Sequence, residues 1–220
     1  MKVFAELYGC VRTGGKALGL GLFLCGTAIA EPVVVAALGD SLTHGYGLAL
    51  EDGFVPQLQG WLNAQGAEVR LINAGVSGDT TQGGLARVDW TLTPDVEALI
   101  VALGGNDVLR AFDPALSRSN LAGIIEAAQA KGVEVMLVGM TAPLNYGAEY
   151  KAAFDGMYPD LANEYETLLA PDFFAGLRDV APDDLPGVMQ GDGLHPNSDG
   201  VTRIVDALGP HVLRLIAAVE

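Results

Sequence analysis

The chain has 220 residues, of which 50% are hydrophobic and 18% are charged, a composition typical of one globular domain. Two cysteines are too few for a disulfide scaffold, and the absence of repeated long apolar runs excludes a membrane protein with several spans. Twelve Lys and Arg against 27 Asp and Glu give a formal net charge of −15, the wrong sign for binding nucleic-acid phosphates or anionic lipid. We therefore expect neutral or cationic partners and no nucleic acid.

Residues 1–30 have the pattern of a secretory signal peptide. Three basic residues accompany an apolar, glycine-rich run over 17–25, and Ala28-Ile29-Ala30 is an A-x-A cleavage site. The apolar run is shorter than the ~20 residues that span a bilayer, which argues against a membrane anchor. We predict cleavage after Ala30 and a single mature domain over 31–220 with no stable membrane anchor. Losing three basic residues and one acidic residue moves the formal charge from −15 to −17, and both cysteines are lost as well.

From Glu31 onward, short runs rich in Val, Ile and Leu alternate with longer segments of helical periodicity, which predicts an α/β fold with a parallel sheet. The predicted strands cover 33–38, 69–72, 98–103 and 133–138. The predicted helices cover 54–62, 80–92, 116–131 and 148–169, the last with a break near Pro159. We predict one three-layer α/β/α sandwich with a mostly parallel five-stranded sheet.

The end of the chain supplies the last two elements. A short fifth strand is expected near Phe173 and Phe174, and Asn197 or Ser198 caps a final helix that is interrupted near Gly209-Pro210. The two tryptophans, Trp61 and Trp90, are predicted to lie in the core.

Polar segments follow the predicted strands, at the sheet edge where ligands bind in such folds. The first strand runs into Gly39-Asp40-Ser41, and a serine at such a turn has an exposed hydroxyl close to N–H groups of a helix N-terminus. Taken alone, the same serine is equally well read as a helix cap. Asp40, and Asp107 after the third strand, are expected to organise these loops by hydrogen bonding.

Two further segments offer hydrogen-bond donors and a base. Gly78 follows the second strand and Asn106 the third, so that a backbone N–H and a side-chain amide are available to an oxyanion. Asp192 and His195 lie three residues apart in a Gly/Pro-rich loop. That spacing lets Asp192 accept a hydrogen bond from one ring nitrogen while the other faces a nucleophile. A lone loop histidine is otherwise usually only solvated.

Together these segments resemble the four sequence blocks of the SGNH, or GDSL-type, hydrolase family, over essentially all of the chain from Val33. The resemblance implies a flavodoxin-like sandwich, Ser41 as nucleophile, Asp192 and His195 as its triad partners, and an oxyanion hole made by Ser41, Gly78 and Asn106. It implies no metal or organic cofactor.

Three stretches narrow the resemblance to one branch. NAGVSGDTTQGGLAR (73–87), LGGNDVLR (103–110) and NYG (145–147) are similar to the secreted bacterial thioesterases, arylesterases and lysophospholipases of the family. This implies hydrolysis of a small-molecule ester, thioester or lysophospholipid in the periplasm or outside a bacterial cell. The sequence leaves the oligomeric state open, and a monomer is the default expectation.

The substrate-binding residues are predicted from the segment after the fourth strand. Ala142, Pro143, Leu144 and Tyr146 are expected to line an acyl groove, although loop packing alone explains them nearly as well. Two other functions stay open: a carbohydrate deacetylase of the same fold, and a secreted binding protein without turnover. G-x-S-x-G, H-E-x-x-H and C-x-x-C motifs are absent from the sequence, which disfavours other hydrolase and metal chemistries.

Overall fold

The computed structural model describes residues 31–219, and the predicted signal peptide lies outside these residues. Its centre is a five-stranded sheet in the order β2-β1-β3-β4-β5, with every neighbouring pair parallel. The strands are β1 (Val33–Gly39), β2 (Val69–Gly75), β3 (Ala98–Ala102), β4 (Glu134–Val138) and β5 (Leu168–Ala170). The predicted α/β fold is confirmed, and the sheet is wholly rather than mostly parallel.

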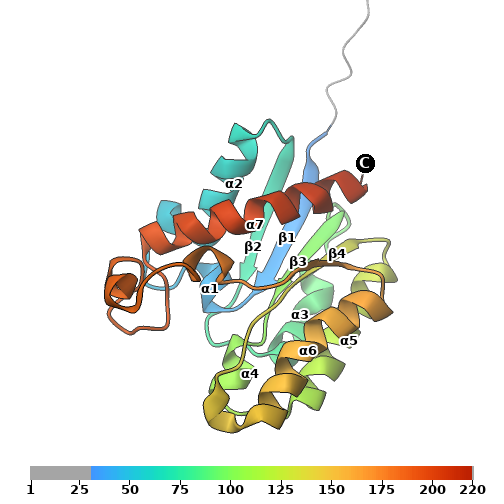
Figure 1. Ribbon diagram of the computed structural model, residues 1–220. Helices are drawn as coiled ribbons and strands as arrows, with labels where there is room; N and C mark the ends of the chain where they lie inside the picture. Colours follow the sequence, from blue (N-terminus) through green and yellow to red (C-terminus); the bar gives the residue numbers. More distant parts are fainter. Residues whose placement is uncertain (1–30, 220) are drawn as a thin grey trace, which may run out of the picture. The chain divides into compact units, whose positions relative to one another are not determined.

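Helices cover both faces of this sheet (Figure 1). The α-helices are α1 (Ser41–His44), α2 (Phe54–Ala64), α3 (Thr81–Thr91), α4 (Gly105–Leu109), α5 (Pro114–Gln129), α6 (Ala148–Glu164) and α7 (Ser198–Val219). Helices α2 and α7 pack together on one face, and α3, α5 and α6 pack side by side on the other.

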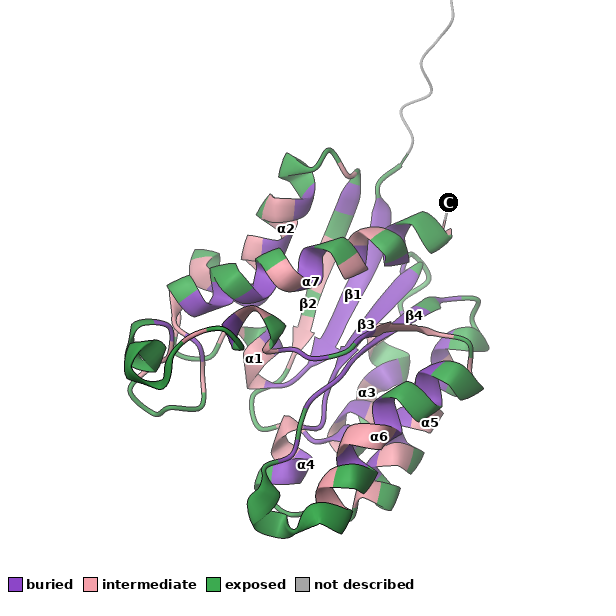
Figure 2. Ribbon diagram, viewed as in Figure 1, coloured by how far each residue is buried: buried purple, intermediate pink, exposed green. Residues whose placement is uncertain are grey.

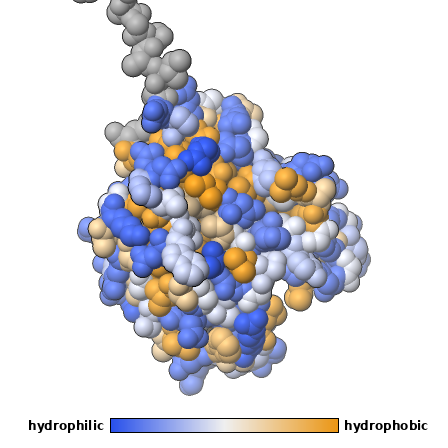
Figure 3. Space-filling model, turned by 180° about the vertical axis from the view of Figure 1, so that it is seen from behind, coloured by the Kyte–Doolittle hydropathy of each residue, from blue (hydrophilic) through white to orange (hydrophobic). Residues whose placement is uncertain are grey.

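The layered arrangement explains the composition of the strands. All residues of β1 and β3 are buried, because helices cover both faces of these central strands. Figure 2 shows this buried core along the sheet, with exposed residues on the outer helix surfaces and the loops. On the face of the molecule shown in Figure 3, hydrophobic residues form patches among hydrophilic ones. Among the described residues, none of the helices is long and apolar enough to cross a membrane.

The fifth strand lies earlier in the chain than predicted. β5 is formed by Leu168–Ala170, which overlaps the end of the segment predicted as a helix, whereas Phe173 is buried in the loop that follows. Phe173 N donates a hydrogen bond at 2.8 Å to the carbonyl of Gly139, the residue after β4, and this bond ties the loop to the end of that strand. The large aromatic side chain therefore marks core burial rather than a strand.

Two helices continue through prolines that were expected to interrupt them. α6 contains Pro159 and α7 contains Pro210, each without a break in the helix. A proline removes one helical hydrogen bond, and burial of the apolar face offsets this loss. Gly209 precedes Pro210 in α7 and packs directly against the Trp61 ring. A Cβ atom on residue 209 would lie 2.6 Å from this ring.

Candidate active site

Ser41 lies at the carboxyl end of the central strand β1, as the first residue of α1. The Asp40 side chain caps this short helix by accepting a hydrogen bond from Leu42 N at 3.0 Å. The helix packs so closely on the end of β2 that a Cβ on Gly75 would lie only 2.3 Å from the backbone nitrogen of His44. Ser41 is thereby held on a short turn at the edge of the sheet where ligands bind in this class of fold.

His195 and Asp192 come together with Ser41 in one line of hydrogen bonds. His195 Nε2 is 2.8 Å from Ser41 Oγ, and His195 Nδ1 is 2.6 Å from Asp192 Oδ2. A carboxylate only accepts hydrogen bonds, so the proton of a neutral imidazole lies on Nδ1 and Nε2 is free to accept from the serine hydroxyl. The arrangement is that of a nucleophile, a base and a group that orients the base.

The loop around Asp192 keeps this carboxyl ionised. The hydrogen bond with the His195 ring, together with the backbone N–H groups of His195 and Leu194, holds the pKa of Asp192 well below its usual value. Gln190 fastens the loop to the protein, since its Nε2 donates to the carbonyls of Tyr46 and Pro196 at 2.8 and 2.9 Å. The Asp192 carboxylate is therefore held in place to orient the imidazole.

The predicted donors to an oxyanion lie at the same place. Gly78 occupies a turn in which Asp79 N donates to the Val76 carbonyl at 3.0 Å, and its φ of 83° is one that glycine adopts without strain. Asn106 lies in the first turn of α4, and its Nδ2 donates to Asp40 Oδ2 at 3.2 Å. Ser41, Gly78 and Asn106 all line one cavity of about 540 Å³.

Apolar side chains make up much of the cavity wall beside these polar groups. The hydrophobic residues that line it, besides Tyr46 and glycine, are Leu42, Val108, Leu109, Met140, Pro143, Phe174, Met189 and Leu194. A second cavity of about 670 Å³ shares the lining residues Thr141, Phe174, Met189 and Gly193 with the first. The space beside Ser41 therefore continues toward the 3-10 segment Pro182–Gly187.

Only one of the four predicted substrate-binding residues lines this cavity. Pro143 does so, whereas Ala142 is buried, and Leu144 and Tyr146 are exposed outside the lining. The backbone of Ala142 is tied to α6, with its N–H donating to Asp155 Oδ1 and its carbonyl accepting from Lys151 Nζ, at 2.8 and 2.7 Å. Of the segment after β4, the residues that line the cavity at Ser41 are Met140, Thr141 and Pro143.

Two buried aspartates organise the loops, as predicted. Asp107, in α4, accepts hydrogen bonds from Thr81 N and from the hydroxyls of Thr81 and Ser117, at 2.9, 2.6 and 2.8 Å. These contacts join α3, α4 and α5 and fix the position of the neighbouring Asn106. Asp40 differs from Asp107, because burial raises its pKa to about 6, against the lowering effect of its hydrogen bonds from Leu42 and Asn106.

The raised pKa of Asp40 predicts a pH dependence of stability. Between its unfolded value of 3.8 and about 6, the folded chain binds this proton and the unfolded chain has released it, so stability is lost as pH rises through that window. We expect Asp40→Asn to remove this loss and to raise the free energy of unfolding at pH 8 by roughly 1–3 kcal/mol. Urea unfolding between pH 4 and pH 8 measures this free energy for the parent and for Asp40→Asn.

The exposed Asp95→Asn serves as the matched control for this substitution, because Asp95 lies on the surface in a pair with Arg70. The stabilised Asp40→Asn protein is also expected to be less active, since an amide has one acceptor oxygen in place of the two that accept from Leu42 N and Asn106 Nδ2. Stability curves of parent and Asp40→Asn that run parallel across this pH range would contradict the account.

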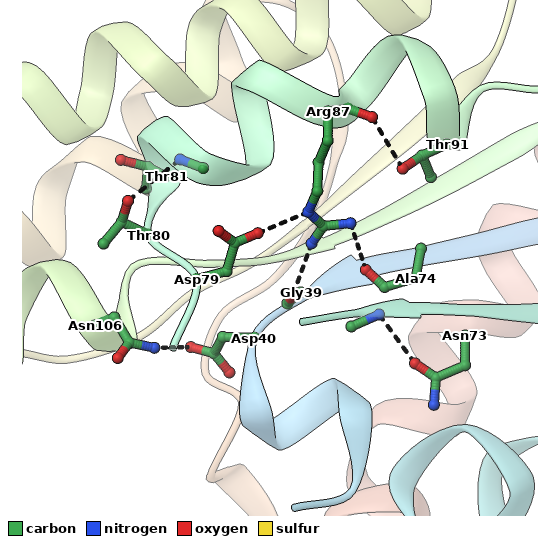
Figure 4. A network of polar contacts seen from close by, with 12 residues as sticks. Gly39, Asp40, Asn73, Ala74, Asp79, Thr80, Thr81, Arg87, Thr91 and Asn106 are labelled. Carbon is green, nitrogen blue, oxygen red and sulfur yellow. Dashed lines mark hydrogen bonds and ion pairs between the residues drawn. The ribbon is translucent and has the colours of Figure 1, made fainter. Parts of the chain in front are cut away.

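Arg87 was not among the predicted site residues, but it lies at the centre of a polar network behind the site (Figure 4). Its guanidinium bonds to the Asp79 carboxylate and to the carbonyls of Ala74 and Gly39. The only signal in the sequence was its position inside the stretch 73–87. Trp90, one helical turn further, is 85% exposed and does not belong to the core as predicted.

Among residues 31–219, no group of three or more His, Cys, Asp or Glu side chains is placed to hold a metal ion. What the arrangement offers instead is a hydroxyl with a base beside it, donors near the same point, and an apolar cavity. These are the groups that acyl transfer to a serine requires.

Comparison with known proteins agrees with this geometry. Residues 37–203 match the model of the GDSL-like Lipase/Acylhydrolase family. Esterase TesA of Pseudomonas aeruginosa is 38% identical over 190 residues, covering 86% of this chain and 91% of the relative. Thioesterase 1/protease 1/lysophospholipase L1 of Escherichia coli K12 is 35% identical over 81% of this chain and 83% of its own.

A solved structure shows the same fold at similar identity. The SGNH-hydrolase family esterase AlinE4 superposes with a TM-score of 0.70 and 43% identity, covering 85% of this chain and 98% of that one. With its sequence blocks, its parallel sheet and its family match in agreement, the chain belongs to the GDSL-like, or SGNH, lipase and acylhydrolase family.

Proposed function

We propose that this protein is a serine hydrolase that cleaves carboxylic esters and thioesters through an acyl-enzyme. The observation that carries the proposal is the line of hydrogen bonds from Asp192 through His195 to Ser41, which ends in the cavity that Gly78 and Asn106 also line. The relatives named esterase and thioesterase support the same reaction class.

In the first half-reaction the Ser41 oxygen attacks the carbonyl carbon while His195 Nε2 takes the hydroxyl proton. The negative charge moves to the carbonyl oxygen, and the backbone N–H groups of Ser41 and Gly78 and the Asn106 amide donate to it. When the tetrahedral intermediate collapses, the bond to the leaving oxygen or sulfur breaks. His195 returns its proton to that atom, which leaves an acyl-serine.

Water completes the reaction through the same base. His195 takes a proton from the water as it attacks the acyl-serine, and the second tetrahedral intermediate expels Ser41, which regains its proton. Asp192, held in its anionic form by the hydrogen bonds described above, stabilises the imidazolium in both half-reactions. No step of this scheme requires a metal or an organic cofactor.

The cavity and the charge of the chain indicate the substrate class. Apolar residues line much of the wall beside Ser41, which favours an acyl or aryl group over the sugar of a carbohydrate deacetylase. The formal charge of −17 on residues 31–220 disfavours polyanionic substrates such as acyl-CoA by long-range repulsion. Neutral aryl esters and zwitterionic lysophospholipids are the preferred candidates.

The cellular setting is part of the proposal and rests on the sequence of residues 1–30. A signal peptide cleaved after Ala30 would deliver the domain to the periplasm or the outside of a bacterial cell, where acyl-CoA is scarce and lipids and aryl esters are available. We propose that it acts there as a monomer without a membrane anchor.

Steady-state kinetics on nitrophenyl esters of two to twelve acyl carbons test the proposed function, with palmitoyl-CoA and a lysophosphatidylcholine as further substrates. We expect turnover of the neutral and zwitterionic esters, with kcat/KM for acyl-CoA rising as salt screens the repulsion. A protein that binds these esters but turns none of them over would be a binding protein that has kept the fold.

A further inference from the structure

Arg87 connects three backbone segments that carry or flank the proposed oxyanion donors. From α3, its Nε donates to Asp79 Oδ2 at 2.7 Å, its Nη1 to the Ala74 carbonyl at 2.8 Å and its Nη2 to the Gly39 carbonyl at 3.0 Å. All three of its nitrogens are thus used, and its side chain is only 19% exposed. Figure 4 shows the guanidinium between the ends of β1 and β2.

Each of these contacts lies next to a group that the proposed reaction uses. Gly39 ends β1 two residues before Ser41, and its carbonyl also accepts from Val76 N at 3.0 Å. Ala74 lies before the turn that contains Gly78, and Asp79 is the last residue of that turn. The N–H groups of Ser41 and Gly78 come from two different loops, so their separation depends on whatever fixes the loops to each other.

A guanidinium suits this role because it is planar and presents its donors at fixed angles. One rigid group bonded to both loops fixes their distance and orientation more tightly than separate contacts could. Arg87 is not among the residues that line the cavity at Ser41, and it lies instead beside Trp90 in a separate cavity of about 300 Å³. Its influence on the reaction therefore passes through the backbone.

We propose that Arg87 is a positioning residue that sets the separation of the Ser41 and Gly78 N–H donors for the oxyanion. This inference rests on the proposed function, and it assigns Arg87 an effect on the transition state rather than on substrate binding. Removing Arg87 also leaves Asp79 without its ion-pair partner, so some loss of stability is expected in any case. The test must therefore separate the two effects.

Arg87→Met and Arg87→Lys test the proposal, with kcat and KM measured on nitrophenyl butyrate and active sites counted with a phosphonate ester. For Arg87→Met we expect kcat per active site to fall on the order of 10-fold to 100-fold with KM within about 3-fold, because donors displaced by a fraction of an ångström stabilise the oxyanion less. Arg87→Lys retains the charge but lacks the planar guanidinium, so we expect its kcat per active site to lie between those of the parent and Arg87→Met.

Binding of butylboronic acid gives the readout that a purely structural role would not change. Boron adds to the serine oxygen as a tetrahedral anion, so its inhibition constant should weaken in parallel with kcat across the Arg87 variants. Arg118→Met is the matched control, because Arg118 pairs with Glu164 on the surface of the α5–α6 layer, away from the cavity at Ser41.

Chemical rescue gives a second readout in Arg87→Ala. The cavity beside Trp90 leaves room for a small cation, so millimolar ethylguanidinium should raise kcat of Arg87→Ala, whereas ethylammonium should not. Arg87 variants with lower melting temperature but unchanged kcat and boronate affinity would overturn the inference and leave the proposed function standing. A parent protein without ester turnover or phosphonate labelling would instead overturn the proposed function.

Discussion

Replacing Ser41 or His195 by alanine is expected to lower kcat for ester hydrolysis on the order of 10⁴-fold to 10⁶-fold, the range seen when a serine nucleophile or its base is removed. The two side chains act as one unit, because the proton that leaves Ser41 Oγ goes to His195 Nε2 across 2.8 Å. The double substitution is therefore expected to be little worse than either single one. Steady-state kinetics on nitrophenyl butyrate measure all three proteins.

Ser119→Ala and His44→Ala are the controls, since both residues are exposed and lie outside the cavity at Ser41. Losses that multiply in the double variant would show that Ser41 and His195 do not act on the same step.

Asn106→Ala is expected to lower kcat on the order of 10²-fold to 10³-fold with a smaller effect on KM, as for the loss of one oxyanion donor. A hydrogen bond to Asp40 fixes the orientation of the Asn106 side-chain amide. Its Nδ2 gives one hydrogen bond to Asp40 Oδ2 at 3.2 Å, and its second N–H is left for the cavity. Kinetics of the variant and its inhibition by a boronic acid measure the loss.

A matched control for the lost amide is Asn63→Ala, an exposed position at the end of α2. If Asn106→Ala raises KM and leaves kcat nearly unchanged, Asn106 is a substrate-binding residue and not an oxyanion donor.

The parallel sheet was predictable because its central strands are buried on both faces and read as continuous apolar runs. Val33–Gly39 and Ala98–Ala102 illustrate this, and their boundaries differ from the predicted ones by a single residue. The errors arose where tertiary packing overrides local signals. Pro159 and Pro210 stay inside helices whose apolar faces are buried, and the three-residue strand β5 is too short to produce a pattern of its own.

The contacts of the site also divide into local ones, which the sequence predicts, and contacts between different elements, which it does not. Asp192 and His195 are three residues apart, so their contact is a local property that the sequence contains directly. The position of Ala142 and the contacts of Arg87 depend on residues of other elements, Asp155 of α6 for the first and Gly39 of β1 for the second. No local pattern encodes such contacts, and only the folded arrangement reveals them.

Covalent labelling with an ethyl phosphonate ester tests the central claim most directly, because the reagent reacts with a serine that a neighbouring base activates. Intact mass followed by peptide mapping should find one phosphonyl group per chain, on Ser41. We expect no labelling in Ser41→Ala and labelling slowed by several orders of magnitude in His195→Ala. A label on another residue such as Ser77, or ester turnover without any label on Ser41, would contradict the account.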